Sequence, residues 1–177
     1  MNTLEAITNR TSYRGIFKNI VVPRADLVKI MEAGLAAPSG CNKQTTSLIA
    51  VDDPHIMDKL RAVIQKSPAD TATAMICVLT QRTIAYRDRT FYIQDYSAAI
   101  QNMLLAIVEL GYESCWYEGH ITDTDAIGRQ MADVLAVPQD YELVCFLPVG
   151  IAEQPVTFVE KKPFAERAWF NGFFHSS

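Results

Sequence analysis

The stretch SAAIQNMLLAIVEL at residues 97–110 is apolar on nearly every side when it is drawn as a helix. Its few polar positions are Ser97, Gln101, Asn102 and Glu109. The pattern predicts a long helix from about Tyr92 to Leu110, and Gly111 is expected to end it. A helix without a polar face has to be covered on all sides, so we expect it either at the centre of the fold or at an interface between subunits.

Shorter elements are predicted before and after this helix. Apolar periodicity and the positions of Pro and Gly indicate four helices, near residues 4–10, near residues 24–37, beginning at Pro54, and from Thr122 to Leu135. The same signals indicate four strands, near residues 47–51, 74–80, 113–117 and 142–151. Thr122 with Asp125 resembles a capping box, and Pro148 is expected at a bulge or an unpaired edge because it has no N–H. Few connections suit parallel crossovers, so the alternation favours a mixed α/β sandwich over a regular Rossmann order.

The C-terminal residues 154–177 carry many aromatic side chains outside any predicted element. These side chains are Phe158, Phe164, Trp169, Phe170, Phe173 and Phe174. Burial of such large apolar rings is strongly favourable. We therefore expect this tail to wrap over its own domain or over a partner chain.

Composition restricts the class of protein. The 177 residues are 49% hydrophobic and 20% charged, which is enough for one domain with a buried core. The net charge of −4 and the lack of a basic run argue against nucleic-acid binding. No apolar stretch approaches the ~20 residues that cross a bilayer, and the N-terminus does not resemble a secretory signal. We expect a cytoplasmic protein that does not bind membranes.

The cysteines and histidines do not indicate a metal or dithiol site. The four cysteines lie 36, 38 and 30 positions apart without a CxxC pair, at Cys41, Cys77, Cys115 and Cys145. The three histidines are scattered along the chain. Reduced thiols and no bound metal are therefore expected.

The first candidate binding cluster is RTSYR at residues 10–14. Arg10, Ser12 and Arg14 occupy alternate positions, so in an extended segment their side chains point to one side. Two guanidinium groups and a hydroxyl are the donors that phosphate oxygens accept from. A solvated basic turn has the same composition and remains an alternative.

Two further clusters lie later in the chain. APSGCNKQ at residues 37–44 combines small residues, which allow close approach to a flat ligand, with amides that donate and accept. An ordinary turn capped by its own Asn explains it as well. GYESCWYEGH at residues 111–120 ends a predicted strand with two aromatic residues and Glu-Gly, and it either faces a ligand or simply belongs to the core. GxGxxG, P-loop, HExxH and GxSxG motifs do not occur, which argues against hydrolase and kinase functions.

Taken in order, the three clusters resemble the FMN-dependent nitroreductase family. Arg10, Ser12 and Arg14 match its R-x-S-x-R motif, and residues 37–44 match its A-P-S-x-x-N-x-Q loop. Other matching positions follow in register, namely Gln101-Asn102, Gly111, Glu118-Gly119, Pro138 and Lys161-Lys162-Pro163. The resemblance covers nearly the whole chain, from about Leu4 to Pro163.

The resemblance implies an α+β fold, a three-layer α/β/α sandwich with a mixed, mainly antiparallel sheet, in one domain that forms an intertwined homodimer. It implies that FMN binds at two subunit interfaces. It also implies that NAD(P)H passes a hydride through flavin N5 to a nitroaromatic, quinone or similar acceptor, by a ping-pong mechanism. No side chain is implied as a catalytic acid or base.

The resemblance also implies which residues bind FMN. They are Arg10, Thr11, Ser12, Arg14 and Lys161 in and around the phosphate site of one chain, Pro38, Ser39, Gly40 and Asn42 reaching the flavin from the other chain, and Trp116, Glu118 and Gly119 along the isoalloxazine ring.

Some features depart from the family pattern. Thr11 replaces a frequent basic residue, Thr45-Thr46 replace Pro-Trp, and Lys161 stands where Arg is common. Between residues 65 and 92 the chain is shorter than the larger members of the family, which have extra helices there over the active site. The side chains in this segment form either a different lid or a solvated loop, and they are Arg82, Tyr86, Arg87 and Arg89. Two alternatives to an enzyme stay open. One is an FMN-binding sensor or storage protein of the same fold, and the other is a non-flavin dimeric module that binds another phosphate.

Overall fold

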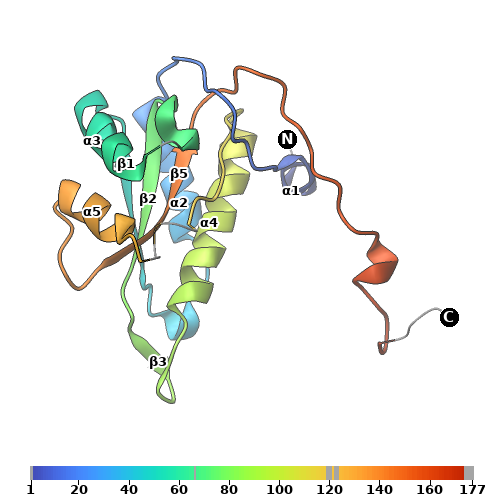
Figure 1. Cartoon of the computed structure of the whole chain (residues 1–177). Helices are drawn as coiled ribbons and strands as arrows, with labels where there is room; N and C mark the ends of the chain where they lie inside the picture. The colour runs from blue at the N-terminus through green and yellow to red at the C-terminus, as the bar shows by residue number, and fades with distance from the viewer. Residues whose placement is uncertain (1, 66, 119–120, 122–123, 174–177) are drawn as a thin grey trace.

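The computed structural model describes residues 2–65, 67–118, 121 and 124–173 (Figure 1). Its centre is a three-stranded antiparallel sheet in the order β1-β2-β5, formed by Thr46–Val51, Ala74–Thr80 and Glu142–Val149. The register pairs Ile76 of β2 with Leu147 of β5. Every residue of β2 is buried, which explains why this strand is apolar along nearly its whole length instead of alternating.

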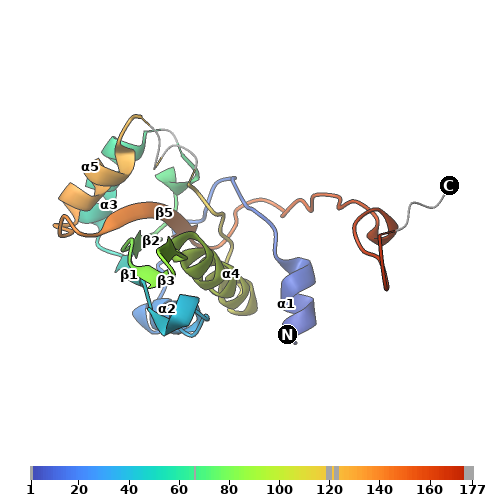
Figure 2. The same ribbon diagram turned by 90° about the horizontal axis from the view of Figure 1, so that it is seen from below.

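Helices cover both faces of this sheet (Figures 1 and 2). One face carries α2 (Arg24–Leu35) and α4 (Tyr92–Glu109), and the other carries α3 (Pro54–Ile64) and α5 (Ile127–Val134). Side chains alternate along β2, so its even-numbered residues pack with α2 and α4 and its odd-numbered residues pack with α3 and α5. The predicted α+β fold with three α/β/α layers is confirmed.

The predicted long helix is confirmed as α4. Its buried side chains form a stripe that packs on the sheet and on α2, comprising Asp95, Tyr96, Ala99, Ile100, Met103, Leu104 and Ile107. Gly34 of α2 allows the two helices to approach closely, since a Cβ there would lie 2.7 Å from Met103 Cγ. The opposite stripe, with Gln101, Leu105 and Val108, stays partly exposed in the single chain. The helix is thus central to the fold, and one side of it is not covered.

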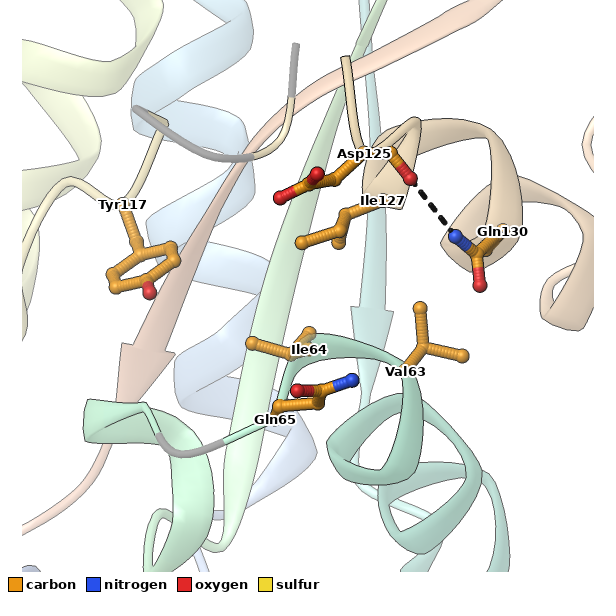
Figure 3. Close-up of a pocket in the computed structure, with 7 residues that line it drawn as sticks. All are labelled: Val63, Ile64, Gln65, Tyr117, Asp125, Ile127 and Gln130. Atoms are coloured by element: carbon orange, nitrogen blue, oxygen red, sulfur yellow. Dashed lines mark hydrogen bonds between the residues drawn. The ribbon is translucent and has the colours of Figure 1, made fainter. Parts of the chain in front are cut away.

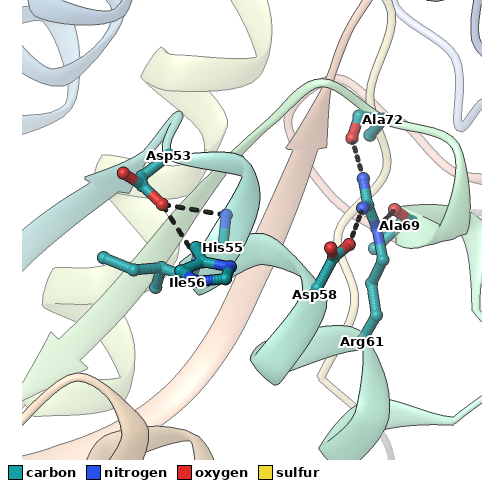
Figure 4. Close-up of polar contacts among 7 residues, drawn as sticks. All are labelled: Asp53, His55, Ile56, Asp58, Arg61, Ala69 and Ala72. Atoms are coloured by element: carbon teal, nitrogen blue, oxygen red, sulfur yellow. Dashed lines mark hydrogen bonds and ion pairs between the residues drawn. The ribbon is translucent and has the colours of Figure 1, made fainter.

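Local chemistry fixes both ends of α3 (Figure 4). Asp53 Oδ1 accepts hydrogen bonds from the backbone N–H groups of His55 at 2.9 Å and Ile56 at 3.1 Å, which caps the first turn. Near the other end, the Arg61 guanidinium donates to the Ala72 carbonyl at 2.7 Å. This bond ties the helix to the segment that leads into β2.

The strand predicted at residues 113–117 does not form. Only the first and last residues of this segment make bridges, to Gly150 and to Phe146. Pro148 lies between those two partners and has no N–H to donate, so the ladder is interrupted there. The prediction that Pro148 lies at an unpaired edge is confirmed, and the same residue explains why the neighbouring strand prediction was wrong.

The helix predicted from Thr122 begins later, at Ile127. Ala126 has a φ of 52°, in the left-handed region, and a right-handed helix cannot continue through it. Asp125 therefore precedes the helix, and Thr122 lies outside the described residues.

Two shorter pieces extend from the layered body. β3 (Ile84–Tyr86) and β4 (Arg89–Thr90) form a hairpin beyond the end of the sheet (Figure 1). Single turns of 3₁₀ helix occur at η1 (Gly40–Asn42), η2 (Pro68–Asp70) and η3 (Phe164–Glu166). None of the helices in the described part of the chain is both long and apolar enough to span a membrane.

The N-terminal helix α1 (Thr3–Asn9) and the C-terminal tail lie outside the layers (Figures 1 and 2). The tail runs beside residues 11–17 as far as Thr157, whose carbonyl accepts a hydrogen bond from Thr11 Oγ1 at 3.3 Å. It then leaves the body, and the described phenylalanines beyond this point are exposed by 60–77%. We predicted that the tail packs on its own domain or on a partner chain, and beyond Thr157 the described residues do not pack on their own domain. Phe174 lies outside the described residues.

Candidate functional site

Residues 10–14 form an extended segment with two distinct sides. Thr11 and Tyr13 are buried, whereas Arg10, Ser12 and Arg14 lie toward the outside. The Tyr13 backbone N–H donates to the Ser114 carbonyl at 2.8 Å, which fixes the segment against residues 112–117. The expected alternation is therefore present, and the Thr11 side chain is turned inward to the tail.

Arg10 and Arg14 are available for an external anion. In the described residues, neither side chain makes a hydrogen bond or an ion pair. By contrast, four other arginines each pair with a carboxylate, namely Arg24, Arg61, Arg82 and Arg129. An unpaired guanidinium is the group that binds phosphate most readily.

The positive charge of Arg14 extends to the neighbouring segment. Burial raises the pKa of the Cys115 thiol to about 11, and the nearby Arg14 guanidinium opposes this rise. Cys115 is fully buried, so its thiol packs as a small apolar group. The Arg14 guanidinium thus acts on the segment that follows Ser114, to which the neighbouring Tyr13 N–H is bonded.

Lys161 follows the point where the tail leaves the body. Thr157 is held beside Thr11, and four residues of extended chain span at most ~14 Å. Lys161 is exposed and has no ion-pair partner in the described residues. No contact in the described structure joins it to Arg10 or Arg14.

The second cluster is a loop held in place by one buried carboxylate. Asp95 of α4 accepts a hydrogen bond from the Gly40 backbone N–H at 2.7 Å and another from Thr45 Oγ1 at 2.7 Å. Ser39 Oγ accepts from the Gln44 N–H at 2.9 Å. The loop borders a pocket of about 180 Å³ whose lining includes Pro38 and Asp95. These hydrogen bonds hold the loop against the first turn of α4.

A side chain is excluded at Gly40 by the packing of this loop. A Cβ there would lie 2.7 Å from the Phe91 ring. Cys41 and Asn42 both have positive φ, at 50° and 54°, so the loop turns sharply between α2 and β1. The Asn42 side chain remains exposed at the surface.

The third cluster is organised by Glu118. Trp116 Nε1 donates to Glu118 Oε2 at 2.7 Å, and the Tyr96 hydroxyl donates to Glu118 Oε1 at 2.8 Å. Burial and this bond to the carboxylate raise the pKa of Tyr96 well above its usual range. Both carboxylate oxygens are thus occupied within the chain. Gly119 lies outside the described residues.

The structure brings some of the predicted residues together and keeps others apart. Trp116 and Glu118 reach the beginning of α4, because Glu118 accepts from Tyr96, the residue after Asp95. The segment with Arg10 and Arg14 lies beside Ser114, whereas the loop with Gly40 contacts the first turn of α4. The two groups lie near opposite ends of α4 (Figure 1). One ligand that touches both groups would therefore need the loop of a second copy of the chain.

A further pocket lies apart from the Arg10–Arg14 segment and the 38–44 loop, although Tyr117 of the third cluster lines it. It has a volume of about 830 Å³ and lies where α3 ends and α5 begins (Figure 3). Among the lining residues that the structure describes, Asp125 carries the one charge, and the Asp125 carbonyl accepts a hydrogen bond from Gln130 Nε2 at 3.0 Å. These described residues offer no cation to a phosphate.

Sequence reasoning missed the role of Asp95. Acidic residues are common in the first turn of a helix, where they complement the helix dipole, so its position carried no special signal. The signal that marks it is structural, because the carboxylate is almost fully buried and satisfies two partners on the loop.

Comparisons with known proteins identify the family of the chain. A model of the nitroreductase family matches residues 7–75 and 64–151. The chain is 26% identical over 158 residues to a candidate NADH dehydrogenase/NAD(P)H nitroreductase of Archaeoglobus fulgidus, which covers 89% of each chain.

Two solved structures share both the fold and enough sequence to be informative. A candidate NADH dehydrogenase/NAD(P)H nitroreductase from Parabacteroides distasonis has a TM-score of 0.82 at 27% identity, over 98% of this chain and 100% of that chain. A nitroreductase with bound FMN from Bacteroides fragilis has a TM-score of 0.76 at 25% identity, over 96% of this chain and 98% of that chain.

Proposed function

Because this chain belongs to the nitroreductase family, we propose that it is an FMN-dependent oxidoreductase that uses NAD(P)H to reduce a nitroaromatic, quinone or similar electron-poor acceptor. The observation that carries the proposal is the pair of unpartnered guanidinium groups, Arg10 and Arg14, on one side of an ordered segment. This pair supplies what a doubly charged phosphate requires, in a chain whose net charge is negative.

The residues at this place fit FMN by their chemistry. Arg10 and Arg14 would form charged hydrogen bonds to the phosphate, and the Ser12 hydroxyl would add a third donor. Lys161 would close over the phosphate from the tail as a point charge. Trp116 lies in the adjacent segment, where its indole would flank the isoalloxazine ring.

The remaining contacts would come from a second subunit. The loop with Pro38, Ser39, Gly40 and Asn42 lies too far along α4 to join the phosphate site of its own chain. An antiparallel pairing of two copies would place each loop over the partner's flavin. The partly exposed stripe of α4 and the unpacked tail provide apolar surface for such a homodimer.

FMN, when bound, supplies a ring that takes a hydride from the nicotinamide at N5 and gives it to the acceptor. The chain's own residues bind and orient the cofactor, and their positive charge favours an electron-rich ring. The donor leaves before the acceptor enters the same place, so ping-pong kinetics are expected. We assign no side chain as acid or base.

The first experiment identifies the cofactor and its reactivity. Freshly purified protein should be yellow and release a compound with the absorbance and mass of FMN. Anaerobic mixing with NADH or NADPH in a stopped-flow instrument should bleach the flavin, and added nitroaromatic or quinone should restore the colour. Colourless protein that ignores added FMN would contradict the proposal. Bound FMN that no nicotinamide reduces would instead favour a sensor or storage protein.

A further inference from the structure

The β3–β4 segment forms a regular hairpin, whereas the sequence allowed either a lid or a solvated loop there. Ile84 pairs with Thr90 and Tyr86 pairs with Arg89. The two residues at the tip, Arg87 and Asp88, have φ values of 45° and 61°. Two successive left-handed residues are the geometry of a type I′ turn, which matches the twist of a short hairpin.

The base of the hairpin is fastened to the body. Arg82 pairs with Glu142 of β5 at 2.7 Å, and its guanidinium lies 5.0 Å from the centre of the Tyr92 ring. The Gln81 backbone N–H donates to the Thr45 carbonyl at 3.1 Å. Since Thr45 also bonds to Asp95, the hairpin and the 38–44 loop are held by the same group of contacts.

The exposed end of the hairpin carries positive charge next to that loop. Strand β3 packs against η1 at Gly40–Asn42, and Lys43 follows η1 directly. Arg87, Arg89 and Lys43 have no carboxylate partner in the described part of the chain, and the one acid at the tip is Asp88. Among the described arginines, those without a carboxylate partner are Arg10, Arg14, Arg87, Arg89 and Arg167, and two of them lie together in the hairpin.

An aromatic ring accompanies these charges. Tyr86 is 52% exposed, and the Arg87 guanidinium lies 5.1 Å from its ring centre. An accessible ring beside two guanidinium groups offers a stacking surface for a base and donors for its phosphates. This combination is suited to a nucleotide and has no evident role in the stability of the body.

We propose that the β3–β4 hairpin binds the phosphate groups of the reduced nicotinamide dinucleotide, through Arg87 and Arg89 with Tyr86 beside them. The inference rests on the proposed function, in which the 38–44 loop reaches the flavin of the partner. The hairpin adjoins that loop, so it would stand over the same flavin and hold the far end of the dinucleotide while the nicotinamide reaches the ring. The shared chemistry is phosphate, supplied by the pyrophosphate of either dinucleotide or by the 2′-phosphate of NADPH.

The test uses a double variant that preserves the turn. Arg87→Asn keeps a residue that tolerates positive φ, and Arg89→Gln keeps a polar side chain on β4. Lys59→Gln, at an exposed position of α3, is the control for the loss of one positive charge at a distant site. Flavin reduction in the holoprotein is followed anaerobically with NADH, NADPH and 1-benzyl-1,4-dihydronicotinamide, which contains no phosphate.

We expect the double variant to need at least tenfold more NADPH or NADH for half-maximal reduction, because loss of one charged hydrogen bond weakens binding by about that factor. Reduction by the benzyl compound should stay within twofold of the parent. A loss confined to NADPH would assign the hairpin to the 2′-phosphate, and equal losses would assign it to the pyrophosphate. In the parent, added salt should weaken NADPH binding, and the variant should respond less.

Three results would overturn the inference. They are an unchanged dependence on both dinucleotides, an equal loss with the benzyl compound, and dissociation of the dimer in the variant. Calorimetric titration of the oxidised holoprotein with NADP⁺ provides a readout that needs no turnover. If no dihydronicotinamide reduces the parent, the proposed oxidoreductase function fails, whereas the titration still decides whether the hairpin binds phosphate.

Discussion

At the scale of single residues, the arginines divide by whether a carboxylate accompanies them. Arg24 and Arg129 are paired on the surface, where ion pairs contribute little to stability. Arg10 and Arg14 have no such partner in the described residues, and the structure of their segment does not depend on their charge. Without a ligand, the two unpaired guanidinium groups cost the folded protein little free energy, because both side chains reach water.

The Arg14→Ala variant should therefore lose cofactor without losing its fold. A lost charged hydrogen bond to phosphate corresponds to roughly 1.5–3 kcal/mol of FMN binding free energy. The expected result is an FMN dissociation constant raised about tenfold to a hundredfold, measured by fluorescence titration of the apoprotein. The thermal midpoint of that apoprotein should stay near that of the parent. Arg24→Ala, which removes an exposed and paired arginine, is the control, and equal FMN affinity in both variants would refute the phosphate assignment.

Glu113 is a residue whose charge opposes folding. Burial raises the pKa of its carboxyl group, and Oε2 has no hydrogen-bond partner in the described residues. The folded chain therefore holds this proton more tightly than the unfolded chain does. The stability gained from this tighter proton binding is fully present below the carboxyl pKa of the unfolded chain. It is lost as pH rises through the raised pKa of Glu113 in the folded chain.

Glu113→Gln should accordingly be more stable than the parent at pH 7, because it has no charge to bury. The advantage should shrink as pH falls and should vanish below about pH 4, where Glu113 is protonated in both states. Thermal melting from pH 4 to 8 measures this trend. Glu160→Gln, in the exposed tail, controls for the change in net charge, and a pH-independent difference for Glu113→Gln would contradict the explanation.

At the scale of elements, two glycines decide how closely helices approach their neighbours. A Cβ at Gly128 of α5 would lie 2.4 Å from the Leu143 carbonyl oxygen, which belongs to the backbone of β5. A Cβ at Gly34 of α2 would meet the flexible Met103 side chain instead. The first contact is rigid, whereas the second can yield.

Gly128→Ala should consequently destabilise the protein more than Gly34→Ala. We expect about 2–3 kcal/mol of unfolding free energy lost at Gly128, because α5 has to move away from the sheet, and about 1 kcal/mol or less at Gly34. Urea unfolding followed by circular dichroism measures both values. Equal losses would show that the approach of α5 to β5 is not rigid.

The elements also show how much of the structure the sequence can predict. Long periodic patterns predicted α4 and the three main strands, because burial on one or both faces leaves a strong apolar signal. The hairpin was not predicted, since its turn uses Arg87 and Asp88 instead of the usual Asn-Gly. The start of α5 was placed too early because nothing in the sequence marks Ala126 as left-handed.

The candidate site shows a similar division. The donors at Arg10, Ser12 and Arg14 follow from alternation in an extended segment, which is a local property. By contrast, the hydrogen bond from Gly40 in the 38–44 loop to Asp95 connects residues 55 positions apart in the sequence. Such a contact becomes visible only in the folded structure. The roles of these residues toward FMN stay predictions.

At the scale of the whole molecule, the single chain leaves apolar surface exposed. Its tail carries exposed phenylalanines, and α1 exposes Leu4 by 73%. Together with the open stripe of α4, these surfaces are what the proposed dimer would bury.

Deletion of residues 158–177 should abolish the dimer. The expected result is a change from twice the chain mass to a single chain mass in light scattering, accompanied by loss of FMN. Lys161→Ala in the full chain is the matched control, because it removes the tail's charge near the phosphate and keeps its aromatic residues. That variant should remain dimeric while it binds FMN more weakly. A truncated protein that is still a dimer would show that the tail is not part of the interface.

The outward course of the tail has a consequence for biosynthesis. In the proposed dimer, each polypeptide would make its last stabilising contacts on the other molecule and could not finish folding alone. The recovery of active protein from denaturant should then follow second-order kinetics, with a half-time that lengthens in proportion to dilution, and newly made copies should be most vulnerable to proteases when expression is low.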